Sequence, residues 1–204
     1  MEALAKNNVS EIVKKGIDYG INYSDYSELM ESLVKNNDTT GELKTEGRIN
    51  FTKLNQRRMK RWDKTVKVSD EIKEEVLRSN KKVSWLVISE SWCGDAAHVL
   101  PIINKIAELN NTIDLKIIFR DEHPEVMDEF LTNGARAIPK LISFNHEEEQ
   151  VEATYGPRPS ELTELVRDFK EEHGMLTEEF KEDIQRWYNK DKGKEIVSDL
   201  LELM

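Results

Sequence analysis

The order of strand-like and helix-like segments between residues 83 and 173 restricts the folds that this chain can adopt. Residues 83–88 are mostly apolar and partly β-branched, which predicts a buried strand. Apolar residues at spacings of three and four then predict a helix over about 97–109. The same two kinds of pattern predict a strand, helix, strand, strand and helix, in that order, at 115–119, 124–132, 140–144, 151–155 and 160–173.

This order of elements predicts the topology of a sheet. Strands joined through a helix pair in parallel, whereas the short polar connection at 145–150 makes the last two strands an antiparallel hairpin. We therefore expect an α/β fold with a central mixed four-stranded sheet flanked by helices. We divide the chain into a helical N-terminal extension that packs on the core (1–80), the α/β domain (81–173) and a C-terminal helical extension (174–204).

The two extensions contain further helical patterns. The N-terminal extension has helical spacing at 24–35, 49–65 and 70–80, and a polar loop is expected at 36–47. The expected N-caps of helices are Ser24, Ser69 and Ser160. The C-terminal extension is expected to form one or two helices. Its apolar stripe is interpreted as packing on the domain rather than as a partner surface, and consists of Phe180, Ile184, Trp187 and Tyr188.

The charge of the chain argues against nucleic-acid binding. The formal net charge is -10, whereas phosphate neutralisation needs clustered Lys and Arg. The basic segment at 56–62 is interpreted as a solvated helix face, with docking of an acidic partner as the alternative.

The apolar runs and the cysteine content indicate a compartment. No apolar run approaches the roughly 20 residues that a membrane helix needs, and residues 1–10 lack the apolar core of a signal peptide. Because the chain has one cysteine, it cannot form an intrachain disulfide. We therefore expect no membrane association and a reducing compartment, the cytoplasm. The oligomeric state is left open.

The turn between the first strand and the first helix of the domain holds the single cysteine, Cys93. Unpaired backbone N–H groups and the positive end of the helix dipole favour a thiolate at a helix start, and the thiolate is the nucleophile. Asp95 acts in the opposite direction, because a like charge disfavours the thiolate. The alternative is that Cys93 is a small buried hydrophobic residue.

Several separate positions carry a resemblance to the thioredoxin family. The segment Trp92-Cys93-Gly94-Asp95-Ala96 resembles the family's Trp-Cys-Gly-Pro-Cys active-site loop. Eight residues after the cysteine, Pro101 stands where the family has a helix-kinking proline. The segment 136–139 resembles the family segment that ends in a cis-proline opposite the cysteine. The resemblance covers about 83–170 and implies a thioredoxin-like fold in which the Ile138–Pro139 bond is cis. The alternative for this bond is an ordinary trans-proline at a strand edge.

Three departures from the family pattern narrow the chemistry. Ala96 replaces the second cysteine, so a dithiol cycle within one chain is excluded. Val87 stands where the family has a buried acid that serves the second thiol. Lys140 follows the proline in place of a small threonine. It either attracts an acidic or glutathione-like ligand or extends its ammonium group from the strand end to water.

The resemblance also implies where substrates bind. Peptide or thiol substrates would lie along Ile138, Pro139 and Lys140, next to the active-site loop residues Trp92, Gly94, Asp95 and Ala96. Arg120 ends the second strand, at the edge of a parallel sheet where such sites gather. It either balances Asp95 or holds a substrate carboxylate, and an ion pair within the protein is the favoured role.

Other site types find little support in the sequence. His98 lies five residues after Cys93, and a surface histidine is favoured over a Cys–His dyad. The four histidines show no paired ligand spacing, and no Gly-rich phosphate loop is present. We expect no metal and no cofactor, except a glutathione-like thiol as co-substrate.

Two functions from different classes follow from these features. The favoured one is thiol–disulfide exchange by a monothiol mechanism, in which Cys93 attacks protein or small-thiol disulfides and an external thiol resolves the product. The alternative is a redox-inactive or redox-sensing module that binds proteins through the groove around Trp92, Ile138 and Pro139. Peroxidase chemistry is a weaker third option, because Thr and Arg residues are not found at the expected spacing around the cysteine.

Overall fold

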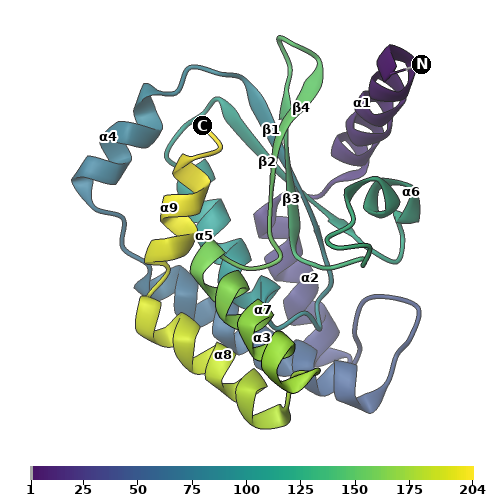
Figure 1. Ribbon diagram of the computed structural model, residues 1–204, viewed down its shortest axis with the longest axis vertical. Coiled ribbons are helices and arrows are strands. Elements are labelled where there is room, and N and C mark those ends of the chain that lie inside the picture. Colours follow the sequence, from purple (N-terminus) through teal and green to yellow (C-terminus); the bar gives the residue numbers. More distant parts are fainter. Residues whose placement is uncertain (1) are drawn as a thin grey trace.

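A four-stranded mixed sheet forms the centre of the molecule (Figure 1). The computed structural model describes residues 2–204, and side chains from residue 8 onward. Met1, the first of the ten residues that are expected to lack the apolar core of a signal peptide, lies outside the described residues. The strands are ordered β2-β1-β3-β4, with β1 parallel to β2 and the other pairs antiparallel. The predicted fold class is confirmed. The strands are β1 (Val83–Ser89), β2 (Ile113–Phe119), β3 (Lys140–Asn145) and β4 (Gln150–Tyr155).

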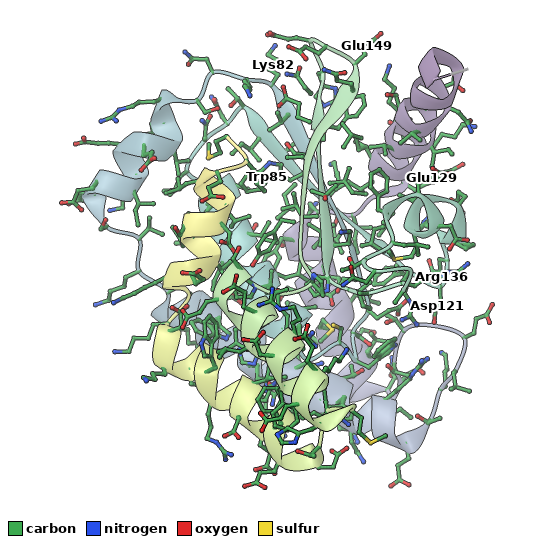
Figure 2. The ribbon with its side chains drawn as sticks, viewed as in Figure 1. Lys82, Trp85, Asp121, Glu129, Arg136 and Glu149 are labelled. Carbon is green, nitrogen blue, oxygen red and sulfur yellow. The ribbon has the colours of Figure 1, made fainter. Side chains whose placement is uncertain are left out.

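Burial explains why β1 is mostly apolar. All of its residues are buried, because both faces of this inner strand are covered. Trp85 at its centre is fully buried and lies among the packed side chains in the middle of the molecule (Figure 2). The sequence therefore shows a mostly apolar run here instead of the alternation of a half-exposed strand.

Helices cover both faces of the sheet. On one side lie α1 (Glu2–Tyr19) and the short α6 (Pro124–Met127). On the other side α5 (Ala96–Ala107) packs against α9 (Lys194–Leu201), which also contacts α7 (Ser160–His173) (Figure 1). A Cβ atom at Gly16 would meet Leu86 at 2.9 Å, so glycine permits the close approach of α1 to β1.

Two N-terminal helices pack on the core. α2 (Tyr23–Lys35) lies at the edge of the sheet, where Ile21, two residues before the helix, pairs with Ile117 of β2. α3 (Glu46–Thr65) packs along α5 and therefore reaches the start of that helix, whereas α4 (Asp70–Arg78) leads into β1.

The helix boundaries correct several predictions. The first predicted helix begins at Tyr23, because Asn22 rather than Ser24 accepts the N–H of Asp25. The predicted Ser69 cap of α4 is confirmed. Ser160 is not an N-cap: it is the first residue of α7, and its N–H and hydroxyl both donate to Asp199 of α9.

Other segments also differ from their predictions. The helix expected over 124–132 ends at Met127 and continues as a 3₁₀ turn at Asp128–Phe130. The C-terminal extension forms α8 (Glu178–Asp191) and α9. Ile184 and Tyr188 of its apolar stripe are buried, and Phe180 and Trp187 pack against the core. Among the described helices, none combines the length and the apolar character needed to cross a membrane.

Candidate active site

Cys93 lies in the turn between β1 and α5 and faces the segment that precedes β3. Its thiol donates to the carbonyl oxygen of Ile138 over 3.2 Å, and its Sγ accepts the N–H of Ala96 over 3.5 Å. The Ile138–Pro139 peptide bond is cis. The single cysteine and the proline segment, which are far apart in the sequence, therefore meet at the end of the sheet.

The ionisation of Cys93 is dominated by burial. The residue is 7% exposed, and burial together with the nearby Asp95 carboxylate raises the pKa of the thiol to about 12. The N–H groups at the start of α5 and the Arg158 guanidinium act in the opposite direction but are outweighed. The helix start therefore favours the thiolate as expected, but burial and Asp95 outweigh it, and the thiol is protonated at neutral pH.

Polar side chains from the N-terminal third hold the loop before Cys93. Asn55 of α3 donates to the Ser91 carbonyl over 3.0 Å, and the hydroxyls of Thr52 and Ser91 lie 2.8 Å apart. The Ser91 hydroxyl also accepts the N–H of Thr40 over 3.0 Å. These side chains are all buried, so the loop is fixed by a buried hydrogen-bond network that the sequence did not reveal.

A buried acid lies three residues before the cysteine, although the family position of such an acid holds valine. Glu90 is fully buried and accepts hydrogen bonds from the Asp121 N–H over 3.0 Å and from the Thr40 hydroxyl. Burial raises the pKa of its carboxyl. Its position at the end of a buried strand was the only sequence signal for it.

The partner of Asp95 is Arg158, which the sequence analysis missed. The Arg158 guanidinium lies 2.7 Å from the Asp95 carboxylate, which also accepts the Tyr188 hydroxyl over 3.1 Å. Burial raises the pKa of Asp95, whereas these two partners lower it. Arg120 does not balance Asp95. It forms its ion pair within the protein with Asp121, at 2.8 Å.

Trp92 forms one wall of the site between two arginines. The guanidinium carbon of Arg48 lies 4.2 Å from the centroid of its ring, and that of Arg120 lies 4.9 Å away. Asp121 lies between these cations, 3.9 Å from Arg48 in addition to its contact with Arg120. The indole is therefore held by cation–π contacts and not by a hydrogen bond.

His98 is buried and does not form a dyad with the cysteine. It is 1% exposed, so the surface position favoured from the sequence is wrong. The Trp62 indole donates to Nδ1 over 2.8 Å, which assigns the ring proton to Nε2, 2.9 Å from the Gln185 amide oxygen. The ring stacks on Tyr188, and burial lowers the pKa of His98 to about 4.

A cleft of about 700 Å³ opens above Cys93. Of the predicted site residues, the structure brings six to its lining: Trp92, Cys93, Gly94, Asp95, Arg120 and Ile138. Ala96, Pro139 and Lys140 lie behind this lining, and burial lowers the pKa of Lys140. The lining residues that sequence reasoning left unassigned are mostly basic or apolar and include Arg48, Phe51, Arg158, Lys170 and Lys181.

The cleft has the donors for an anion and not the ligands for a metal. In the described part of the chain, no three His, Cys, Asp or Glu side chains are placed to hold a metal ion. The planar guanidinium groups of its arginines instead match the hydrogen-bonding geometry of carboxylate and phosphate groups.

A family model described as Thioredoxin matches residues 43–173, which include α3, α4 and the whole sheet. The chain belongs to the thioredoxin family. The family match begins within the segment that we assigned to the N-terminal extension, so α3 and its contacts to the Cys93 loop fall inside the matched region.

Two solved structures share the fold of this protein along nearly the whole chain. One is a protein of unknown function from Pseudomonas aeruginosa, with 15% identity, a TM-score of 0.63 and coverage of 92% of this chain and 93% of that chain. The other is an HIV epitope-scaffold, with 16% identity, a TM-score of 0.64 and coverage of 93% and 95%. No curated protein matches the sequence. At these identities the likeness shows the fold alone.

Within this thioredoxin-family site, one sulfur is available for chemistry. Cys93 is the only cysteine of the chain, and the methyl group of Ala96 stands one helical turn after it. A disulfide formed at Cys93 must therefore be resolved by a thiol from outside the chain.

Proposed function

We propose that this thioredoxin-family protein carries out thiol–disulfide exchange with Cys93 as its single nucleophile. The observation that carries the proposal is that the cysteine lines an open cleft and lies 3.2 Å from the carbonyl oxygen that precedes cis-Pro139. Protein or small-molecule disulfides are the proposed substrates. A reducing compartment such as the cytoplasm suits a protein with one cysteine.

The exchange has two balanced steps. After losing its proton to water, the Cys93 thiolate attacks one sulfur of the substrate disulfide, and the other sulfur leaves as a thiolate with the electron pair of the broken bond. An external, glutathione-like thiolate then attacks the substrate sulfur of the mixed disulfide. This second step releases a new disulfide and regenerates the Cys93 thiolate. The cycle consumes no other oxidant or reductant.

The high pKa of Cys93 limits the rate in the resting state. With a thiol pKa of about 12, the thiolate fraction at pH 7 is on the order of 10⁻⁵. A more basic thiolate is also a stronger nucleophile, which recovers roughly two orders of magnitude. The net rate is then a few hundred-fold below that of a thiol with a pKa near 7. We propose that bound substrate reduces this deficit by displacing the thiol from the Ile138 carbonyl.

The burial of Cys93 favours a second candidate function. A protonated thiol that is 7% exposed suits a redox-inactive or redox-sensing module that binds protein partners in the same cleft. In that case Trp92 and Ile138 would contact the partner, and Cys93 would contribute no turnover.

A turnover assay separates the two candidates. The wild type and the Cys93→Ser variant would be compared in the reduction of a glutathionylated peptide, with reduced glutathione as resolving thiol. We expect turnover by the wild type only, together with a glutathione adduct on Cys93 in the intact mass. Wild-type turnover no higher than that of a folded Cys93→Ser variant would reject the exchange activity in favour of the binding module.

A further inference from the structure

Resting on the exchange chemistry proposed for this cleft, we propose that its substrates are disulfides with negatively charged groups close to the reacting sulfur. Six cationic side chains line the cleft, whereas the only carboxylate in its lining is Asp95. The chain as a whole carries a net charge of -10. The cationic lining residues are Arg48, Arg120, Arg136, Arg158, Lys170 and Lys181.

Three of these cations form an inner set that is already ordered. The side chains of Arg48, Arg120 and Arg158 are 22%, 18% and 23% exposed. Trp92 holds the first two by stacking, and Asp95 holds the third by an ion pair. Because these guanidinium groups are fixed before a ligand arrives, binding an anion requires little further ordering of side chains.

The inner set has hydrogen-bond donors to spare. Three guanidinium groups face two carboxylates, Asp95 and Asp121, and each guanidinium has five N–H donors. Two buried donors, Arg158 Nε and the Trp92 indole N–H, have no acceptor among the described residues. A ligand with carboxylate oxygens can accept hydrogen bonds from the guanidinium N–H groups that Asp95 and Asp121 leave unpaired.

The outer cations contribute less selectivity, because most have partners of their own. Arg136 forms a bidentate pair with Asp128, with both contacts at 2.6 Å, and Lys181 lies 2.6 Å from Glu178. Arg136 is seen in Figure 2 near Asp121, at the same edge of the molecule. The inner arginines are therefore the residues that distinguish an anionic substrate from a neutral one.

The charge distribution affects both the approach of a substrate to the cleft and the breaking of its disulfide. An anion is repelled by most of an acidic protein and attracted at this cleft, which concentrates it near Cys93. When the substrate disulfide breaks, the leaving sulfur carries a new negative charge. Arg120 and Arg158 stabilise that charge better than water-exposed lysines would, because they are partly buried.

Two aromatic disulfides, one anionic and one neutral, test the inference. 5,5′-Dithiobis(2-nitrobenzoate) carries carboxylates, whereas 2,2′-dithiodipyridine is neutral at pH 8. Their rates with Cys93 would each be divided by the rate with free N-acetylcysteine amide. We expect a selectivity of about tenfold for the anionic probe at low salt, falling several-fold in 0.5 M salt.

Variants assign this selectivity to the inner arginines. Arg48→Gln and Arg120→Gln are each expected to lower the preference for the anionic probe about threefold, whereas Arg120→Lys retains part of it. Lys64→Gln, on an exposed part of α3 outside the cleft, serves as the matched control and leaves the preference unchanged. Circular dichroism confirms that each variant is folded.

The outcomes separate this inference from the proposed function. If the neutral probe reacts at Cys93 as readily as the anionic one after normalisation, exchange stands and the anionic substrate class is rejected. If neither probe labels Cys93, exchange is rejected. Calorimetry on the Cys93→Ser variant then decides the ligand class: tighter binding of oxidised glutathione than of cystamine supports an anionic ligand, and equal binding or none overturns it.

Discussion

The ionisation of one thiol is decided by effects of unequal size. A helix N-terminus typically stabilises a negative charge by about 0.3–1 kcal/mol, which is less than one pKa unit. Burial shifts the pKa of an enclosed group by up to about 3–5 units, and a nearby like charge adds to it. Cys93 experiences all three, so burial and Asp95 outweigh the start of α5. Asp95 is the contribution that one substitution can remove.

The Asp95→Asn variant is predicted to react faster than the wild type. Without the carboxylate, and with the Arg158 cation left unbalanced, the pKa of Cys93 falls by about one unit or more. Iodoacetamide alkylation would be measured from pH 6 to 10. The wild-type rate should rise about tenfold per pH unit without a plateau, because the thiol pKa lies near 12.

The exposed Asp183 on α8 provides a matched control for this charge change. Asp183→Asn removes the same charge far from the thiol and should leave the alkylation profile unchanged. A wild-type plateau below pH 8, or an Asp95→Asn variant slower than the wild type, would contradict the assigned role of Asp95.

At the scale of elements, the sequence predicted what depends on neighbours along the chain. The run at 83–88 could be assigned to a strand because its residues are buried on both faces. The cap of α7 could not be predicted, because Asp199 lies 39 residues beyond Ser160. Arg158 was missed for the same reason: nothing next to it in sequence indicates that the end of β4 folds over Asp95.

The segment after β4 shapes the site through one glycine. Gly156 has a φ of +105°, and a Cβ atom there would overlap the carbonyl oxygen of Pro139. Because that atom belongs to the backbone, it cannot move aside as a flexible side chain can. We predict that Gly156→Ala lowers the free energy of unfolding by roughly 2–4 kcal/mol and changes the alkylation rate of Cys93.

Gly134 offers a matched control for the backbone conformation. It also has a positive φ, +75°, but nothing lies within 4 Å of its missing Cβ. Gly134→Ala should therefore cost only about 1–2 kcal/mol, the strain of a left-handed conformation. Both variants would be measured by urea unfolding, and equal losses would show that contact with Pro139 is not what requires glycine at 156.

At the scale of the whole molecule, both terminal segments contribute to the site of the central domain. Trp62 of α3 and Gln185 of α8 bind the two nitrogens of His98, across 36 and 87 residues of sequence. Tyr188 of α8 stacks on the same ring and also donates to Asp95. His98 looked like a surface residue because the helices that cover it lie outside 83–170, the segment on which the sequence resemblance rested. Its burial could be found only from the packed chain.

This buried cluster makes stability depend on pH. The folded protein holds His98 neutral down to a pKa of about 4, whereas the unfolded chain protonates it near 6.5. Between these values the unfolded state binds more protons, so the free energy of unfolding falls as the pH drops from 6.5 towards 4. The expected loss of unfolding free energy from this residue approaches about 3 kcal/mol at pH 4.

Urea unfolding of the wild type and of His98→Gln at pH 7 and 4.5 separates the contribution of His98 from the titration of carboxylates. The variant is less stable at pH 7 but should lose less on acidification, whereas the exposed-site control His173→Gln should follow the wild type. An acid-induced loss in His98→Gln as large as in the wild type would mean that the contacts of His98 with α3 and α8 do not hold this histidine neutral.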